Sequence, residues 1–290
     1  MPTILVTGGA GQLATALAAR STDVIVVGRP GFDFDRRETI DDVIPRHRPA
    51  VVVNAAAWTA VDAAEADPAG ARRANADGPA RLAARCHAAG IPFVHLSTDY
   101  VFDGEKRAPY VETDPTAPTG VYGATKLEGE RLVQDAAPQS VILRTSWVYA
   151  ATGRNFLRTM LALSQTREHL RVVADQRGCP TAAHELARVV HAVAEAALDW
   201  RPDYAGVFHT AGEGETTWHG FALAIFDEAA RQGGRKPTVE AITTADYPTQ
   251  ARRPPDSRLD CGKLARVFGL RQAPWRESLP EVVQQAMSHG

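Results

Sequence analysis

The sequence is poor in cysteine, in long apolar runs and in excess charge of either sign. Its three scattered cysteines, Cys86, Cys179 and Cys261, give neither a metal-ligand spacing nor an even set for disulfide bridges, so we expect reduced thiols and no metal site. No run of about 18 apolar residues occurs, which predicts that the chain does not cross a membrane. The formal net charge of −2 comes without a basic cluster, and we expect no nucleic-acid partner.

The first residues also lack the basic and apolar regions of a secretory signal, because glycines interrupt them at once. A cytoplasmic location is therefore expected. With 290 residues, of which 44% are hydrophobic and 23% charged, the composition is that of an ordinary globular protein. This length is enough for one large α/β unit or two domains with a buried core.

The first half of the chain alternates short apolar runs with amphipathic stretches. Strands are predicted at residues 3–7, 24–27, 50–54, 91–96 and 140–145. Helices are predicted at residues 12–20, 38–46, 68–89 and 122–136. Because the strand segments are continuously apolar, we expect them to be buried on both faces. The pattern predicts an α/β fold built on a Rossmann-type, doubly wound parallel sheet.

After about residue 150 this regular alternation loosens. Helices are predicted at residues 156–165, 185–198 and 217–232, and one more strand at residues 207–210. We expect residues 1–150 to form the sheet domain, which segments near residues 170–212 rejoin. Residues 151–290 are expected to form mainly a smaller, mixed C-terminal lobe.

The turn after the first predicted strand has the spacing GxxGxxA, with Gly8, Gly11 and a small Ala14. Glycine suits a turn of positive φ and lets the backbone approach a pyrophosphate, while the following helix begins with free N–H groups at Gln12 and Leu13. We therefore predict that residues 1–150 bind a dinucleotide, NADPH or NADH. The alternative is a purely structural glycine turn.

Two further segments are candidates for contact with this cofactor. At the end of the second strand Arg29 stands where NAD-selective sites usually carry an acidic residue, and a guanidinium there favours the 2′-phosphate of NADPH. Arg29 could equally be a solvated surface residue. Asp33 and Phe34 are predicted to flank the adenine, although Asp33 could instead serve the ribose. The small residues after the third strand, which give the cofactor room but also suit helix–sheet packing, are Ala55, Ala56 and Ala57.

Tyr122 and Lys126 form a YxxxK pair near the start of a predicted helix. A spacing of four residues puts both side chains on one helical face, where an ammonium can stabilise a phenolate. Ser97 and Thr98 end the fourth predicted strand at the same edge of the sheet, so a hydroxyl group there can bind a substrate carbonyl beside the tyrosine. The glycine turn, this hydroxyl and the YxxxK pair together favour acid–base catalysis on a carbonyl compound.

Seven stretches spread over nearly the whole chain carry a resemblance to a known family. They are VNAAAWTAVDAAE (53–65), STDYVFDG (97–104), VYGATKLEGE (121–130), LRTSWVYA (143–150), DQRGCPT (175–181), TTWHGFA (216–222) and ARRPPDSRL (251–259). The chain resembles the dTDP-4-dehydrorhamnose reductase family, within the extended short-chain dehydrogenase/reductase superfamily. The last four stretches are the more specific to this family, and the resemblance implies that they lie in the substrate-binding half.

The resemblance implies hydride transfer to the C4 ketone of a dTDP-4-keto-6-deoxy sugar. It makes Tyr122 the proton donor, Lys126 the residue that lowers the tyrosine pKa and holds the nicotinamide ribose, and Thr98 a hydrogen-bond partner of the carbonyl oxygen. The residues that it places near the substrate are Asp99, Trp147 and Asn155.

The adjacent residues Arg252 and Arg253 are candidates for binding this substrate on chemical grounds that do not depend on the resemblance. Guanidinium groups suit a diphosphate, and the chain has no general basic patch. The alternative is a solvated surface pair.

Other functions remain open on the sequence. They are a 4-ketoreductase for a different dTDP-deoxysugar, an epimerase or dehydratase of the same superfamily, and a non-catalytic nucleotide-binding regulatory subunit. Some members of the family dimerise through a metal held by an acidic residue of the first helix. This chain has Ala14, Thr15 and Ala16 there, so we expect a monomer or a weak homodimer without a metal link.

Overall fold

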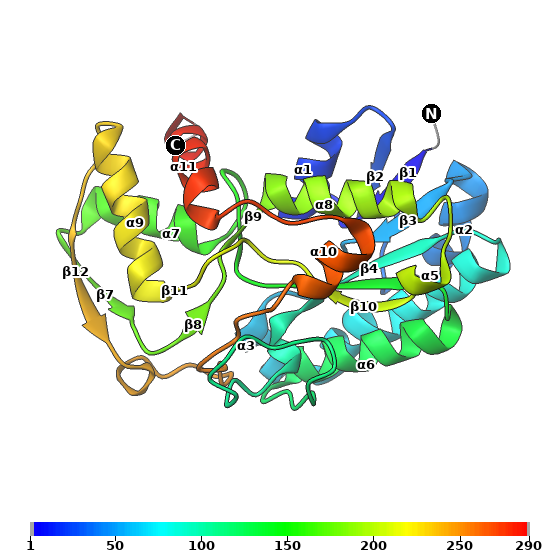
Figure 1. Cartoon of the computed structure of the whole chain (residues 1–290), viewed down its shortest axis with the longest axis horizontal. Coiled ribbons are helices and arrows are strands. Elements are labelled where there is room, and N and C mark those ends of the chain that lie inside the picture. Colours follow the sequence, from blue (N-terminus) through cyan, green and yellow to red (C-terminus); the bar gives the residue numbers. More distant parts are fainter. Residues whose placement is uncertain (1–2, 289–290) are drawn as a thin grey trace.

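A computed structural model describes residues 3–288 and contains a six-stranded, all-parallel sheet at the centre of one half of the molecule (Figure 1). The strand order is β10-β5-β4-β3-β1-β2. Their bounds are β1 Ile4–Thr7, β2 Val24–Val27, β3 Val51–Asn54, β4 Phe93–Thr98, β5 Val141–Thr145 and β10 Gly206–His209. The α/β class and the doubly wound parallel sheet are therefore confirmed. In the described part of the chain, no helix has the length and apolar character that a membrane span requires.

Helices cover both faces of this sheet. Successive residues of each strand point to opposite faces, so each strand packs against both layers of helices. Ile4 and Val6 of β1 pack with helices α1 (Gln12–Arg20) and α8 (Ala183–Ala196), whereas Leu5 packs on the other face. The helices of that second face are α2 Arg37–His47, α5 Gly78–Ala88 and α6 Val121–Ala136. Apolar side chains on both faces explain why the strands read as continuous apolar runs.

Strand β1 lies between β3 and β2, so the order of the strands reverses at this point of the sheet. Connections leave β1 and β3 toward opposite faces, which opens a crevice at the carboxyl ends of these two strands. The fold thus places the glycine turn after β1 and the small residues after β3 on either side of one opening.

The predicted long helix at residues 68–89 is three consecutive helical segments, and a further short helix, α3 (Val61–Ala66), precedes it. The segments are α4 Pro68–Arg72, a π-helical turn over Arg73–Asp77 and α5 Gly78–Ala88. The π turn lies against α6, where Gly129 has no space for a side chain because a Cβ would overlap the Asn75 carbonyl oxygen. A sequence period of 3.6 residues does not distinguish such a turn from continuous helix.

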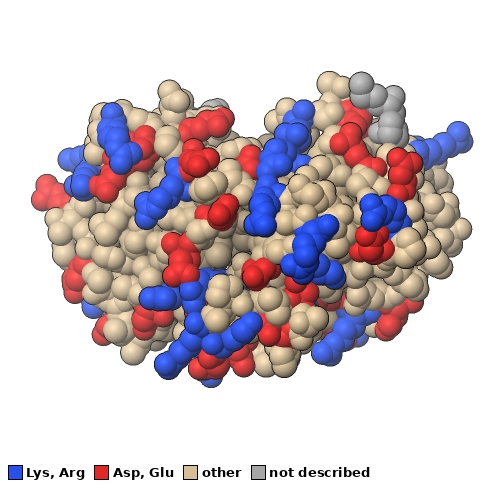
Figure 2. All heavy atoms as spheres, viewed as in Figure 1, with Lys and Arg blue, Asp and Glu red and all other residues tan. Residues whose placement is uncertain are grey.

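The other half of the molecule is built from three two-stranded ladders and the helices that pack on them (Figure 1). The pairs are β7 (His169–Val173) with β12 (Thr238–Ile242), β6 (Val148–Tyr149) with β9 (Thr181–Ala182), and β8 (Arg177–Gly178) with β11 (Thr216–Thr217). The helices are α7 Phe156–Thr166, α9 Trp218–Arg231 and α11 Trp275–Ser288, while α10 (Gly262–Phe268) packs beside β10. Acidic and basic side chains are interspersed over the face shown in Figure 2.

A buried ion pair joins helix α6 to the sheet. The Glu130 carboxylate accepts from Arg144 Nε at 2.8 Å and Nη2 at 2.7 Å, and the Ser97 hydroxyl also donates to it, at 2.5 Å. Arg144 Nη1 lies 3.4 Å from His209 Nε2 in β10. All four side chains are buried. Together they form one polar cluster that connects α6 with strands β4, β5 and β10.

We predict that Glu130→Gln lowers the free energy of unfolding by about 3 kcal/mol or more, because Arg144 then stays buried without a counter-charge. Urea denaturation measures this loss. The control is Glu128→Gln, also in α6, because the exposed pair of Glu128 with Arg72 of α4 contributes less than about 1 kcal/mol. Equal losses in the two variants would contradict the assignment of Glu130 as the structural anchor.

Candidate active site

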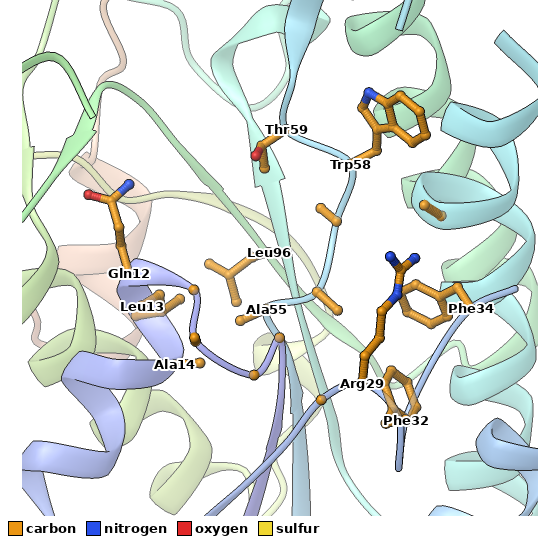
Figure 3. A pocket seen from close by; sticks show the side chains of 18 of the residues that line it. Gln12, Leu13, Ala14, Arg29, Phe32, Phe34, Ala55, Trp58, Thr59 and Leu96 are labelled. Carbon is orange, nitrogen blue, oxygen red and sulfur yellow. The ribbon is translucent and has the colours of Figure 1, made fainter. Parts of the chain in front are cut away.

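A cavity of about 680 Å³ opens at the carboxyl ends of β1 and β3. Gln12 and Arg29 stand at opposite sides of it, with Ala55 between them (Figure 3). Every residue predicted to bind the cofactor lines this cavity: Gly8, Gly11, Gln12, Leu13, Arg29, Asp33, Phe34, Ala55, Ala56, Ala57, Tyr122 and Lys126. The lining alone does not assign their roles, but it brings all of them to one opening.

The glycine turn fits a dinucleotide for reasons visible in its backbone. Gly8 has φ +118°, and a Cβ there would lie 3.1 Å from the Ala55 carbonyl. At the end of β2 a Cβ on Gly28 would lie 2.5 Å from Gly9 Cα. Helix α1 begins after Gly11 without a side-chain cap, so the N–H groups of its first turn are available to an anion.

One residue that lines this cavity also has a buried polar atom without a partner. Gln12 Oε1 is buried and has no hydrogen bond among the described residues. Such an atom costs stability unless a ligand or water satisfies it. Together with the free N–H groups of α1, it makes the donor and acceptor set of this end of the cavity suitable for a bound nicotinamide dinucleotide.

Phe34 and Asp33 lie on the Arg29 side of the cavity. Phe34 packs over Gly78 and meets Phe32 edge-on, with ring centroids 5.1 Å apart. Arg29 Nε lies 3.1 Å from Asp33 Oδ2, and this arginine is largely exposed. The segment thus offers an aromatic wall, a carboxylate and a guanidinium where adenosine recognition is predicted.

Tyr122 and Lys126 lie on the first turns of α6, and Thr98 ends β4 beside them. Burial raises the pKa of Tyr122 to about 12, and a hydrogen bond with Thr98 partly opposes that shift. Burial lowers the pKa of Lys126 to about 8, although the charge of Glu130 acts the other way. Lys126 Nζ donates to the Leu96 carbonyl at 2.6 Å. The net shift of the Tyr122 pKa is therefore upward, opposite to the lowering expected from the sequence, because burial is its largest cause.

Asp99 is buried directly after Thr98, whose hydroxyl donates to Asp99 Oδ1 at 3.0 Å. Burial raises the pKa of Asp99 to about 6, and hydrogen bonds with Ser257 and Thr98 oppose the shift. Its other oxygen, Oδ2, has no partner among the described residues. Asp99 is thus a buried carboxyl group with one oxygen that has no partner among the described residues.

Trp147 lies between the two halves of the molecule in a left-handed conformation, with φ +45°. Its ring stacks on that of Trp218, with ring centroids 3.5 Å apart, and a Cβ on Gly178 would overlap the Trp147 ring. A bulky residue at positive φ is strained and needs such support from its neighbours. Arg177, next to Gly178, has backbone hydrogen bonds with Pro255 and Ser257. Ser257 also hydrogen-bonds Asp99, so this segment connects the surroundings of Trp147 to Asp99.

The other residues predicted to bind the substrate are Arg252, Arg253 and Asn155, and they lie in different environments. Arg253 is partly buried and holds Asp62 with two hydrogen bonds of 3.0 and 2.7 Å. Arg252 is exposed and lies 3.4 Å from Glu105. Asn155 caps α7: its amide accepts from Arg158 N–H and donates to two backbone carbonyls. The structure therefore gives Asn155 a local structural role and leaves Arg252 at the surface.

The cavity also has lining residues that we did not single out from the sequence. Thr145 ends β5 and has a buried Oγ1 without a partner among the described residues. The rule that ligands bind at the carboxyl ends of parallel strands could have identified it. Trp58 is held by its backbone N–H to Asn75 Oδ1 at 2.9 Å, a contact with the π turn that no local pattern indicates.

A second cluster of titratable residues lies near the opposite edge of the sheet, where Asp23 precedes β2. His191 Nε2 is 3.3 Å from Asp23 Oδ1, and Nδ1 is 3.2 Å from Glu195 Oε2. These three could offer ligand atoms within 4.8 Å of one another. Both ring nitrogens already face carboxylates, one within α8 and one in the segment before β2, so the cluster joins α8 to that segment.

Comparison with known proteins gives concordant matches. The family model described as RmlD substrate binding domain matches residues 2–288. A dTDP-4-dehydrorhamnose reductase of Sinorhizobium fredii is 45% identical over 291 residues, covering 99% of this chain and 98% of the relative. The crystal structure of a dTDP-4-dehydrorhamnose reductase from Bacillus anthracis in complex with NADP is 31% identical, with a TM-score of 0.90 and coverage of 98% and 99%.

A further relative is named for a different activity. It is the probable dTDP-4,6-dihydroxy-2-methyloxan-3-one 4-ketoreductase of Streptomyces antibioticus, 40% identical over 288 residues, which cover 96% of this chain and 93% of the relative. The full-length family match and the 45% identical reductase decide the membership. The chain belongs to the dTDP-4-dehydrorhamnose reductase family.

Proposed function

We propose that this chain is a cytoplasmic, NAD(P)H-dependent reductase that converts dTDP-4-dehydro-6-deoxy-L-mannose, also called dTDP-4-dehydro-L-rhamnose, to dTDP-L-rhamnose. The observation that carries this proposal is that Tyr122 and Lys126 line the cavity that fits a dinucleotide, and that Tyr122 has a hydrogen bond with Thr98. Family membership and the NADP-bound relative support it.

A bound NADPH or NADH supplies the hydride that reduces the C4 ketone. Tyr122 remains protonated at neutral pH and donates its phenolic proton to the developing alkoxide. Thr98 hydrogen-bonds the same oxygen and fixes its position. Lys126 is charged below a pH of about 8, so its ammonium stabilises the phenolate left after proton transfer and holds the nicotinamide ribose.

The substrate is expected to lie between the sheet domain, residues 1–150, and the lobe formed mainly by residues 151–290. Asp99 Oδ2 can accept from a sugar hydroxyl, and the supported Trp147 ring offers an apolar wall. Arg253 is positioned for the diphosphate, because its pairing with Asp62 holds the guanidinium in one orientation. The chain is expected to act as a monomer or weak homodimer.

A 4-ketoreductase for a different dTDP-deoxysugar is the second candidate, because one relative bears such a name. The same catalytic set would serve it, and only the residues around the sugar would differ. A non-catalytic nucleotide-binding subunit would have no need of the clustered hydroxyl, phenol and ammonium.

We predict NADPH and NADH oxidation with the dTDP-4-keto-6-deoxy-L-sugar made in situ from dTDP-glucose by a dehydratase and an epimerase, with dTDP-L-rhamnose identified by NMR. Tyr122→Phe is expected to lower kcat by about 10²- to 10⁴-fold, because the proton donor is lost, while NADPH binding by calorimetry is unchanged. Tyr204→Phe, which packs on Phe268 away from the cavity, is the control. Full activity in Tyr122→Phe, or NADPH binding without turnover in the wild type, would argue against the proposed reaction.

The pH dependence should follow Lys126 rather than Tyr122. Because the pKa of Lys126 is about 8 and that of Tyr122 about 12, kcat/KM is expected to fall as pH rises through about 8, while the proton donor is still protonated. Lys126→Arg keeps its charge and should move this fall to higher pH. Lys263→Arg on α10 should leave it unchanged, and an identical profile for Lys126→Arg would refute the assignment.

The two adjacent arginines should differ in their effect on substrate binding. Arg253→Gln is expected to raise KM for the nucleotide-sugar by about tenfold or more, because an oriented guanidinium binds a diphosphate strongly. Arg252→Gln, at an exposed position, should change KM by less than about threefold. Steady-state kinetics on both variants tests this difference, and equal effects would contradict it.

A further inference from the structure

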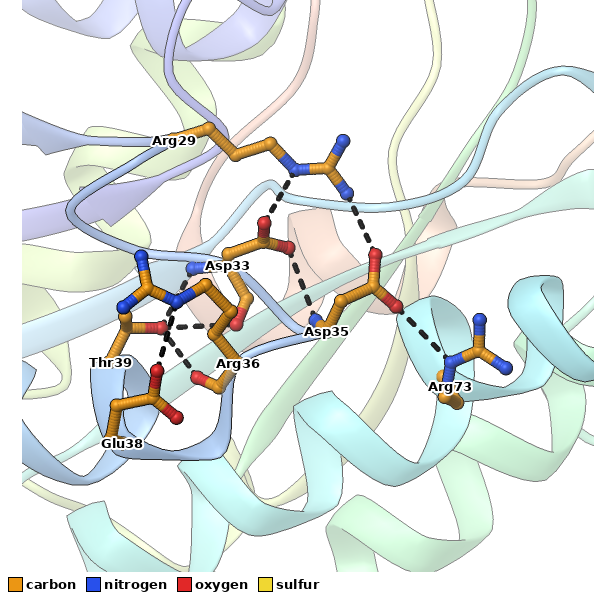
Figure 4. Close-up of polar contacts among 7 residues, drawn as sticks. All are labelled: Arg29, Asp33, Asp35, Arg36, Glu38, Thr39 and Arg73. Atoms are coloured by element: carbon orange, nitrogen blue, oxygen red, sulfur yellow. Dashed lines mark hydrogen bonds and ion pairs between the residues drawn. The ribbon is translucent and has the colours of Figure 1, made fainter.

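At the adenosine side of the cavity a carboxylate bridges two arginines (Figure 4). Arg29 Nη2 lies 3.2 Å from Asp35 Oδ2, and Arg73 Nε lies 3.1 Å from Asp35 Oδ1. Each oxygen of Asp35 thus faces a different guanidinium. Arg29 comes from the end of β2 and Arg73 from the π turn, so the two cations converge from separate elements on one anion.

Asp33 and Asp35 are held in different ways, although both line the cavity. Asp33 Oδ1 accepts from the Asp35 backbone N–H at 3.1 Å, and the Asp33 backbone N–H and carbonyl are both within hydrogen-bond distance of the Thr39 hydroxyl. The Asp35 carboxylate has only Arg29 and Arg73 as partners among the described residues. Asp33 is therefore fixed by the local backbone as well as by its pair with Arg29 Nε, whereas the Asp35 carboxylate can leave without breaking a contact to the main chain.

The bridge is also weak enough to be exchanged. About half of the Asp35 and Arg73 side chains and 73% of that of Arg29 are exposed to solvent. Exposed ion pairs contribute at most about 1 kcal/mol each. A phosphate group carries more charge than a carboxylate and offers three oxygens to guanidinium groups, so it competes well for the same position.

We propose that Arg73 and Arg29 together form the site for the 2′-phosphate of NADPH, and that Asp35 is the internal anion that this phosphate displaces. This inference rests on the proposed use of a nicotinamide dinucleotide. With NADH, which lacks the phosphate, Asp35 keeps its place between the arginines and Asp33 keeps its contact with Arg29 Nε. The competition between Asp35 and the phosphate then sets the ratio of NADPH to NADH affinity.

Calorimetric titration of the full chain with NADPH and NADH tests this directly. Arg73→Gln is expected to weaken NADPH binding by about five- to twentyfold at low ionic strength and to leave NADH binding unchanged, because only NADPH loses a charge-assisted contact. Asp35→Asn, which removes the competing anion, is expected to strengthen NADPH binding several-fold and again leave NADH binding unchanged.

Matched controls exist on the same segment. Arg36 and Glu38 form an exposed pair of their own, at 2.9 Å, and contact neither Asp35 nor Arg73 (Figure 4). Arg36→Gln and Glu38→Gln change the net charge by the same amounts and should not alter the NADPH to NADH ratio. Titration with 2′,5′-ADP and 5′-AMP repeats the comparison without the nicotinamide half.

The outcomes separate this inference from the function on which it depends. If neither dinucleotide binds to the wild type, the proposed cofactor fails. If both bind but Arg73→Gln affects them equally or not at all, or Asp35→Asn weakens NADPH binding, the two-arginine site is wrong. If the Arg36 and Glu38 controls shift the ratio of NADPH to NADH affinity as much as Arg73→Gln and Asp35→Asn do, the effect comes from net charge alone. The two-arginine site would then also be wrong.

Discussion

The contact on which the catalytic edge depends is the buried pairing of Glu130 with Arg144 and Ser97. A helix that packed on the sheet by apolar contacts alone could slide by a fraction of a turn at little cost. A carboxylate that must meet a guanidinium from β5 and a hydroxyl from β4 permits one position only, since any slip leaves a buried charge unpaired. Helix α6 is therefore held in register one turn beyond Lys126.

Two glycines complete this constraint from the outer side of α6. A Cβ at Gly129 would overlap the Asn75 carbonyl oxygen, and one at Gly123 would overlap the Tyr100 carbonyl oxygen. The helix thus touches backbone at both points, and Tyr122 is placed next to Thr98 by packing rather than by a flexible loop. The rise in the Tyr122 pKa and the fall in the Lys126 pKa both follow from the depth at which this packing buries them.

Much of this arrangement could be predicted from the sequence because its signals are local. Continuous apolar runs mark the first five strands, and the rule that ligands bind at the carboxyl ends of parallel strands predicts that Thr98 and Tyr122 share one edge. The two-residue strands of the second half carry too few residues to show a period, and the π turn at residues 73–77 looks like ordinary helix. Asn155 and Arg252 show the remaining limit: residue type indicates what a side chain can bind, but whether a helix cap or solvent already occupies it depends on tertiary contacts.

The contact between Gly28 and Gly9 has a consequence for how this protein can change. Any side chain at position 28 would collide with the backbone of the glycine turn, so a carboxylate cannot stand at that position unless the turn moves. In the cofactor site proposed here, discrimination between the two nicotinamide cofactors depends instead on exposed side chains of the following segment, Arg29 and Asp35. Substitutions at these exposed positions can therefore change the preference for NADPH or NADH while the stability of the fold stays the same.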